Sequence, residues 1–260
     1  MGVIRQRFKQ LQKKGKKAFI PYVTFGYPTI MTFESIVIAL DQAGADFIEV
    51  GLPFSDPIAD GPIIQASSKA ALDKGATIYN MLTSLKRLKK KVSAPLVLMT
   101  YYNPVYHMGL ERFFFRARAS LDGIVVADLL AEEAQEFVRL AKKNDIDTIF
   151  FISPTTQKER VRLIDRLSSG FVYYISVTGV TGPRKKLPSG IMGHLKSVKK
   201  GLTSPVCIGF GISTRTQART FKKYFDGVIV GSALVQHIID KHKNKDFLKR
   251  FQGFAKWLNG

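Results

Sequence analysis

The sequence predicts a closed (β/α)8 barrel, known as a TIM barrel, formed by a single domain over residues 1–260. Eight short apolar runs rich in β-forming residues recur along the chain, and helical patterns separate them. These runs hold almost no polar residues, as expected for a parallel sheet that helices cover on the outside. A chain of 260 residues with 45% hydrophobic content and no interrupting linker has the size of one such barrel.

The expected strands follow one another at spacings that leave room for a helix in each gap. In order, they are Ala18–Val23, Phe47–Val50, Pro95–Met99, Gly123–Val126, Thr148–Ile152, Phe171–Ser176, Pro205–Ile208 and Gly227–Val230. After the fourth run, Ala134, Phe137 and Ala141 share one face of a helix, with charged residues on the other. An open doubly wound sheet is the alternative, but it would carry a Gly-x-Gly-x-x-Gly turn after the first strand, and that turn is absent.

An extra helix is expected at the N-terminus, before the first strand. The first seventeen residues hold seven basic side chains and no acidic one, and Ile4, Phe8 and Leu11 lie at helical spacing. The segment has no serine, which argues against a transit peptide, and no apolar run resembles a secretory signal or a membrane span. We therefore expect a cytoplasmic protein that makes no membrane contact.

The net charge of +20, from 40 Lys and Arg against 20 Asp and Glu, raises the question of a nucleic acid partner. The basic residues form short runs scattered over outer helix faces, without a groove-reading motif, so no nucleic acid partner is expected. The positive field does favour a phosphorylated substrate. Cys207 is the single cysteine and is expected in the core, and the four histidines lie without metal-ligand spacing, so no metal is expected.

Glu49 is the residue that points most directly to chemistry, because it is a carboxylate inside an apolar run that otherwise reads as a buried strand. Side chains alternate across a strand, so Glu49 points into the barrel if Ile48 and Val50 pack on the outer helices. It also lies near the C-terminal end of its strand, where barrel enzymes keep their chemistry. Burial there would raise its pKa toward neutrality and let it donate and accept a proton. The alternative is a structural carboxylate paired with Arg or Lys.

Two further acids, Asp56 and Asp60, lie in the Pro- and Gly-rich loop that follows this strand. Acids are common in turns, and Asp60 could cap the next helix, so spacing alone leaves their roles open.

Glycine-rich turns follow three consecutive strands near the end of the chain. They are Thr178–Gly182, Gly209–Ser213 and Gly231–Ser232. Backbone N–H groups at such turns and at helix starts bind phosphate, and barrels commonly build this site after strands seven and eight. The alternative is plain turn glycine, but three such turns in one layer favour a phosphate site.

These residues resemble the tryptophan synthase α subunit family, and the resemblance covers essentially the whole chain. The most specific motif is Ile-Glu-Val-Gly-Leu-Pro-Phe-Ser-Asp-Pro-Ile-Ala-Asp-Gly-Pro-Ile-Ile-Gln at residues 48–65. Supporting motifs are Met-Thr-Tyr-Tyr-Asn-Pro at 99–104, Tyr-Tyr-Ile-Ser-Val-Thr-Gly-Val-Thr-Gly at 173–182 and Gly-Phe-Gly-Ile-Ser at 209–213.

The resemblance implies a lyase of tryptophan biosynthesis that cleaves indole-3-glycerol phosphate to indole and glyceraldehyde 3-phosphate without a metal or cofactor of its own. It implies that Glu49 is the acid and base at indole C3 and the glycerol hydroxyl, and that Asp60 holds the indole N–H. The other implied substrate contacts are Tyr22 and Tyr101 at the indole, Tyr173 at the carboxylates, Thr181 at Asp60, and Gly182, Phe210, Gly211, Gly231 and Ser232 at the phosphate.

The resemblance also implies a β subunit partner in an α2β2 heterotetramer, with Pro53 and Asp56 facing it. Pyridoxal phosphate belongs to that partner, which receives the indole through a tunnel. The chain departs from the family after the fourth strand, where Ala-Asp-Leu-Leu-Ala-Glu-Glu at 127–133 replaces a proline-containing segment and is expected to loosen the loop.

Three other classes of function remain as alternatives: another phosphate-binding barrel enzyme, a silent partner subunit and a nucleic acid binder. A sugar-phosphate epimerase would need metal-binding His and Asp, and an indole-glycerol-phosphate synthase a catalytic Lys on a strand, and neither arrangement is visible. A silent partner would bind phosphate and activate the β subunit without turnover, but drift would then remove the acids first, and Glu49, Asp60 and the three glycine turns are all present. A nucleic acid binder is supported by charge alone.

Overall fold

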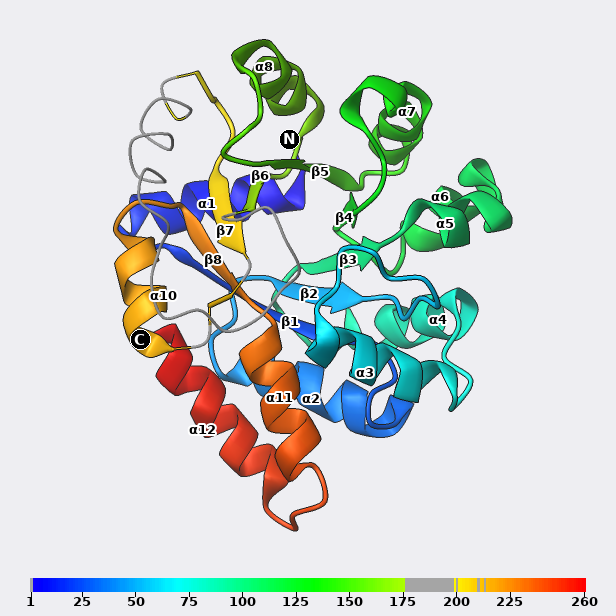
Figure 1. Cartoon of the computed structure of the whole chain (residues 1–260), viewed down its shortest axis with the longest axis vertical. Helices are drawn as coiled ribbons and strands as arrows, with labels where there is room; N and C mark the ends of the chain where they lie inside the picture. The colour runs from blue at the N-terminus through cyan, green and yellow to red at the C-terminus, as the bar shows by residue number, and fades with distance from the viewer. Residues whose placement is uncertain (1, 176–198, 200, 210, 213) are drawn as a thin grey trace.

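The computed structural model describes residues 2–175, 199, 201–209, 211, 212 and 214–260. Its eight strands form a closed parallel barrel in chain order, so that the first strand pairs with the last (Figure 1). The strands are β1 (Ala18–Thr24), β2 (Ile48–Gly51), β3 (Leu96–Thr100), β4 (Gly123–Val126), β5 (Asp147–Ile152), β6 (Val172–Ile175), β7 (Val206–Gly209) and β8 (Gly227–Val230). Their ends differ from the expected ones by one residue at most, and the predicted barrel is confirmed.

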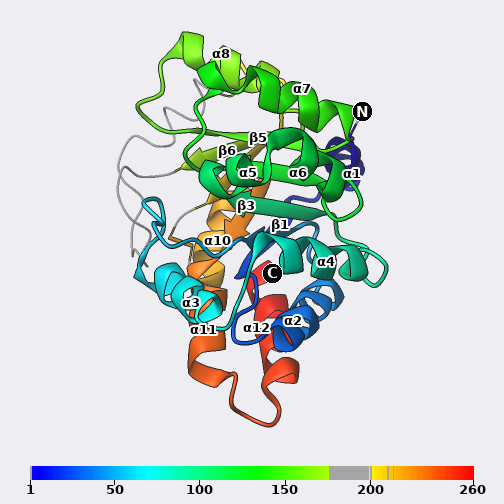
Figure 2. The ribbon, with the colours of Figure 1, turned by 90° about the vertical axis from the view of Figure 1, so that its right-hand side faces the viewer.

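Helices surround the barrel on its outside (Figures 1 and 2). They are α1 (Val3–Lys13), α2 (Ile30–Gln42), α3 (Pro62–Leu72), α4 (Ile78–Leu88), α5 (Tyr102–Met108), α6 (Leu110–Ala117), α7 (Gln135–Lys143), α8 (Lys158–Leu167), α10 (Arg215–Lys222), α11 (Ser232–Lys241) and α12 (Phe247–Asn259), with a 3-10 turn η1 (Ala131–Glu133). None of these helices is long and apolar enough to cross a membrane.

Strand alternation divides the apolar side chains into an inner and an outer cluster. Ile48 and Val50 belong to the outer cluster, between strands and helices, whereas Phe47 belongs to the inner one. Glu49 lies between them in sequence and therefore points into the barrel. In the sheet it is flanked by Tyr22 of β1 and Val97 of β3.

The expected N-terminal helix, α1, closes the N-terminal end of the barrel. The ring of Phe8 stacks on Phe47, with the ring centroids 4.8 Å apart, and meets Phe171 edge-on at 5.8 Å. The first turn is fixed by the N–H of Ile4, which donates to the Asp147 carboxylate at 3.1 Å. In Figure 2, α1 lies at the opposite end of the barrel from the loop between β2 and α3. The loops that follow the strands therefore lie at the other end of the barrel, which α1 does not cover.

The loop after β4, where the family's prolines are missing, is tied to its neighbours. Asp128 accepts a hydrogen bond from the Tyr102 N–H at 2.7 Å, and Glu132 forms an ion pair with Arg160 at 2.9 Å. The ion pair is about half exposed and contributes roughly 0–1 kcal/mol. The hydrogen bond from the Tyr102 N–H to the Asp128 carboxylate thus holds this loop against the start of α5.

Candidate active site

Glu49 lies inside the C-terminal half of the barrel and is fully buried. Neither of its carboxylate oxygens has a hydrogen-bond partner among the described residues. Burial, followed by the charge of Asp60, raises the pKa of Glu49 to about 8. The alternative interpretation of the sequence is a structural carboxylate paired with Arg or Lys. No such pair involves Glu49 in the part of the chain that the structure describes. Glu49 is therefore a carboxyl group able to give up and regain a proton near neutral pH.

Asp60 approaches Glu49 from the loop that joins β2 to α3. Burial raises the pKa of Asp60 to about 6, and a hydrogen bond with Tyr101 acts in the opposite direction. The Tyr101 hydroxyl also accepts the N–H of Ala59 at 2.9 Å, and Gln65 donates to the Asp60 carbonyl oxygen at 2.8 Å. The loop is thus fixed on both sides of Asp60. The two carboxyl groups titrate at different pH values, as acid and base roles require.

Two buried phenols, Tyr22 and Tyr173, flank the carboxyl groups. Burial raises the pKa of each well above its usual value, and the charges of Asp60 and Glu49 add to this effect. Both hydroxyls therefore stay protonated and can donate hydrogen bonds. Two glycines make room for these side chains. A Cβ atom on Gly51 would lie 2.0 Å from the Tyr22 hydroxyl oxygen, and a Cβ atom on Gly209 would lie 2.3 Å from the Tyr173 hydroxyl oxygen.

A cavity of about 50 Å³ lies between these groups and the start of α11. It is lined by Tyr22, Glu49, Asp60, Ile64, Met99, Tyr173, Gly211, Ile229, Gly231 and Ser232. Seven of these are site residues expected from the sequence, drawn from distant parts of the chain. Sequence reasoning missed Ile64, Met99 and Ile229. Met99 and Ile229 share the inward face of their strands, so alternation in the strands was the signal that could have found them.

The lining combines the acids and phenols with apolar side chains and with backbone at the start of α11. Ser232 is the first residue of the ten-residue helix α11, and Gly231 precedes it as the N-cap. Gly211 has a φ of +77°, which side chains rarely adopt, and lies beside them in the cavity wall. Free N–H groups at a helix start are suited to bind an anion.

Tyr101 does not line the cavity but lies behind Asp60, with its ring stacked on Phe54 at 5.0 Å. Of the two residues expected to face a partner, Asp56 is exposed and Pro53 is buried in the isolated chain. Three further expected site residues, Thr181, Gly182 and Phe210, lie outside the described residues.

The histidines and the cysteine play no part in the cavity as far as the chain is described. Cys207 is fully buried inside the barrel, as expected. His237 stacks on Phe254 at 4.6 Å, His242 contacts the Ile238 carbonyl oxygen at 2.9 Å, and His194 lies outside the described residues. Within those residues, no group of three or more His, Cys, Asp or Glu side chains could hold a metal.

Comparison with known proteins gives one consistent result. A model of the family "Tryptophan synthase alpha chain" matches residues 8–259. The tryptophan synthase alpha chain of Geotalea daltonii is 46% identical over 237 residues, which cover 91% of this chain and 90% of that protein. The corresponding chain of Geobacter sp. (strain M21) is 43% identical over 99% of this chain and 97% of its own length.

Solved structures agree with the sequence relatives. The crystal structure of tryptophan synthase subunit alpha from Legionella pneumophila superposes with a TM-score of 0.92 at 33% identity, covering 100% of this chain and 97% of that chain. A chain of Mycobacterium tuberculosis tryptophan synthase superposes with a TM-score of 0.91 at 32% identity, covering 99% and 97%. With the acid pair and the helix start facing one cavity, this chain belongs to the tryptophan synthase alpha chain family, the lyases of the alpha reaction in tryptophan biosynthesis.

Proposed function

We propose that Glu49 and Asp60 carry out the reaction of this family, the cleavage of indole-3-glycerol phosphate to indole and glyceraldehyde 3-phosphate. The observation that supports this assignment is the unpaired, fully buried Glu49, whose pKa burial raises to about 8. A carboxyl group in such an environment is suited to act first as an acid and then as a base.

In the first step, the Glu49 carboxyl group donates its proton to indole C3. C3 becomes tetrahedral, and positive charge develops on the ring nitrogen. The resulting Glu49 carboxylate then removes the proton of the adjacent glycerol hydroxyl. The bond between C3 and the glycerol carbon breaks, its electron pair returns to the indole ring, and the hydroxyl carbon becomes the aldehyde. Glu49 ends protonated, as it began.

Asp60 supports this sequence by accepting the indole N–H as charge develops there. Its pKa of about 6, against about 8 for Glu49, leaves Asp60 ionised while Glu49 still holds its proton. Opposite charges in a buried pocket attract strongly, so the cationic ring is stabilised more than the neutral substrate. Tyr101 holds Asp60 from behind.

The remaining lining of the cavity offers the kinds of surface that the rest of the substrate needs. Met99, Ile64 and Ile229 offer an apolar surface to the indole ring. The phosphate lies against Gly211, Gly231 and Ser232, at the N-terminus of α11. Thr181, Gly182 and Phe210 complete the proposed site, as the family resemblance implies.

A β subunit is proposed as the partner, in an α2β2 assembly, with pyridoxal phosphate bound by that subunit and none by this chain. Exposed Asp56 lies on the loop that carries Asp60, so a partner at this loop would act directly on the position of a catalytic acid. Pro53, buried beneath the loop, would act through the loop backbone.

The decisive experiment replaces Glu49 by Gln, which keeps the shape of the side chain and removes the proton exchange. We expect indole formation to fall by roughly 10²–10⁴-fold or more, since this is the range for loss of one general acid–base group. Binding of indole-3-glycerol phosphate should remain, because the phosphate and indole contacts are unchanged. Turnover measured by indole release and binding measured by calorimetry separate the two effects. Unchanged turnover would remove Glu49 from the mechanism.

The phosphate assignment is tested separately by Ser232→Asp. A carboxylate at the start of α11 would repel the phosphate, so KM should rise by at least about tenfold, equivalent to about 1.4 kcal/mol. Ser35→Asp on α2, away from the cavity, is the matched control and should leave KM unchanged. Equal KM values in both variants would contradict the assigned phosphate site.

A further inference from the structure

Two buried hydroxyl groups, those of Thr24 and Ser67, lie next to the wall of the proposed active site. Thr24 ends β1 and is 2% exposed, and Ser67 lies within α3 and is fully buried. Neither lines the cavity, but α3 packs against β1 and brings the two hydroxyl oxygens to 2.7 Å from each other. Buried hydroxyl groups need hydrogen-bond partners, and the partners decide which way each proton points.

The direction of each hydrogen bond follows from the number of protons available. The Ser67 hydroxyl oxygen lies 2.8 Å from the carbonyl oxygen of Ile64, which can only accept, so Ser67 donates its one proton there. In the contact between Thr24 and Ser67, Thr24 must therefore be the donor. The Thr24 oxygen is then left with lone pairs alone, and it can bond to a third group only as an acceptor.

That third group is the phenol of Tyr22, which lies two residues earlier on β1 and on the same inward face. A Cβ atom on Gly51 would lie 2.0 Å from the Tyr22 hydroxyl oxygen, so this oxygen lies over Gly51, which pairs with Thr24 in the sheet. A side-chain hydrogen bond joins Tyr22 to Thr24. Because the Thr24 proton is already used, the phenol donates this bond, and the phenol oxygen keeps its lone pairs.

The Tyr22 oxygen thus becomes a hydrogen-bond acceptor beside the acids. Tyr22 lines the cavity together with Asp60. After burial, the charge of Asp60 contributes most to raising the pKa of Tyr22, which shows that the two groups lie near each other. Two neighbouring acceptors suit one donor between them. In the proposed reaction that donor is the indole N–H, whose positive charge grows as C3 is protonated.

We propose that Thr24 and Ser67 are positioning residues, which hold the Tyr22 hydroxyl so that its oxygen accepts the indole N–H beside Asp60. This inference rests on the proposed reaction and deepens it. Because the chain of hydroxyl groups orients the acceptor before the substrate binds, no rearrangement is needed as charge develops. The bond is stronger to the cationic ring than to the neutral substrate, so its loss should lower kcat and leave KM nearly unchanged.

Thr24→Val tests the chain of hydroxyl groups, because valine keeps the branched shape of threonine and removes its hydroxyl. We expect kcat for indole formation to fall about tenfold, equivalent to about 1.4 kcal/mol, with KM unchanged. Thr24→Ser, which keeps the hydroxyl, should retain most of the kcat. A fall in kcat that is as large in Thr24→Ser as in Thr24→Val would overturn the proposal.

Ser67→Ala tests the far end of the chain. It frees the Thr24 proton to turn toward Tyr22, so kcat should again fall with KM unchanged. Ser68→Ala is the matched control, since Ser68 is the next residue of α3, is also buried and makes no hydrogen bond with Thr24. Equal kcat values in the Ser67 and Ser68 variants would contradict the assigned role of Ser67.

The decisive measurement is a double-mutant cycle with Tyr22→Phe. Thr24→Val should lower kcat about tenfold in the parent chain and have no further effect in the Tyr22→Phe variant. An equal fall in both would show that Thr24 acts only through the fold and would overturn the proposal, as would an unchanged kcat in Tyr22→Phe alone.

The proposed reaction fails by a different result, which is unchanged turnover in Glu49→Gln. Absence of coupling between Thr24 and Tyr22 would leave that reaction in place and remove only the role of the hydroxyl groups.

Discussion

At the scale of single residues, the two carboxyl groups predict the pH dependence of the reaction. The proposed mechanism starts with Asp60 ionised and Glu49 protonated. As pH rises through about 6, Asp60 loses its proton and activity should increase. As pH rises further through about 8, Glu49 loses the proton that it must donate, and activity should decrease. The measured kcat/KM should therefore follow a bell with limbs near these two values.

The coupling between the acids gives this prediction an internal check. The charge of Asp60 helps to raise the pKa of Glu49, so Asp60→Asn should move the alkaline limb to lower pH and remove the acidic limb. These shifts concern the residual activity, which is expected to be low. An alkaline limb that stays in place in Asp60→Asn would assign that limb to another group.

At the scale of elements, the strands must leave room for the phenols that surround the acids. Gly209 ends β7, and a methyl group there would lie 2.3 Å from the Tyr173 hydroxyl, which is less than a real contact allows. Because the Tyr173 ring is buried, Gly209→Ala should displace it and lower kcat by at least tenfold. Loss of stability should accompany this by roughly 1–3 kcal/mol, the usual range for overpacking a core.

Gly253, inside α12, provides the control for Gly209→Ala. Its added methyl group would meet no atom within 4 Å, and alanine is favoured over glycine in a helix by roughly 0.5–1 kcal/mol. Gly253→Ala should therefore leave kcat unchanged and raise the free energy of unfolding measured in urea. Equal kcat in both variants would show that the place of the Tyr173 ring is not needed for turnover.

At the scale of the whole molecule, exposed apolar side chains lie on the segments that follow three successive strands of the barrel. Ile58, after β2, is 79% exposed, Tyr106 on α5, which follows β3, is 66% exposed, and Leu130, after β4, is 49% exposed. Exposed apolar side chains that form a contiguous patch are typical of a protein–protein interface. Ile58 lies on the loop that carries Asp60 and is the most exposed of the three, so it is the side chain with which to test the proposed β subunit contact.

Ile58→Asp tests this contact. A charge in the centre of the interface should weaken the complex with a family β subunit by at least tenfold, measured by sedimentation or calorimetry, and should leave the melting temperature of the free chain unchanged. Phe115→Asp is the control, since Phe115 is 61% exposed in the last turn of α6, which leads into the start of β4 at the other end of the barrel. An equal effect of both substitutions would locate the partner elsewhere or show only a charge effect.

The sequence by itself determined the barrel and the place of Glu49 in it. The pattern of eight apolar runs reflects the local requirement that a covered parallel strand be apolar on both faces, and a single acid at an inward position stands out against it. Alternation along β2 was enough to direct Glu49 inward, because its neighbours Ile48 and Val50 had to face the helices.

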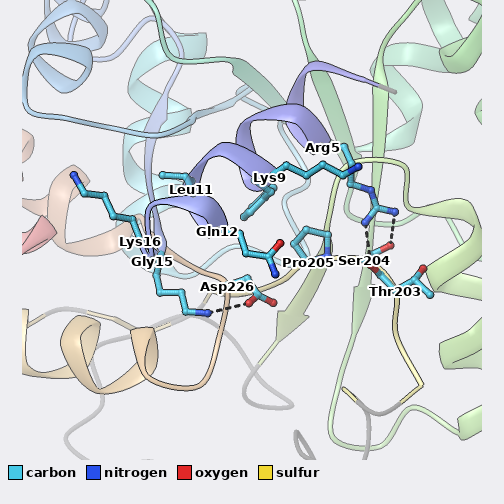
Figure 3. A pocket seen from close by; sticks show the side chains of 12 residues that line it. Arg5, Lys9, Leu11, Gln12, Gly15, Lys16, Thr203, Ser204, Pro205 and Asp226 are labelled. Atoms are coloured by element: carbon cyan, nitrogen blue, oxygen red, sulfur yellow. Dashed lines mark hydrogen bonds and ion pairs between the residues drawn. The ribbon is translucent and has the colours of Figure 1, made fainter.

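Only the tertiary structure decided which residues meet. Met99 and Ile229 lie 130 residues apart in the chain, and their place beside Glu49 depends on the register of a closed sheet, which no local pattern specifies. The same holds for the cavity of about 560 Å³ between α1 and the segments that lead into β1, β7 and β8, where basic residues of α1 meet the starts of β7 and β8 (Figure 3). In the sequence those residues belong to a charged helix and to the starts of two distant strands. Only the packing of α1 across the end of the barrel brings them together around one cavity.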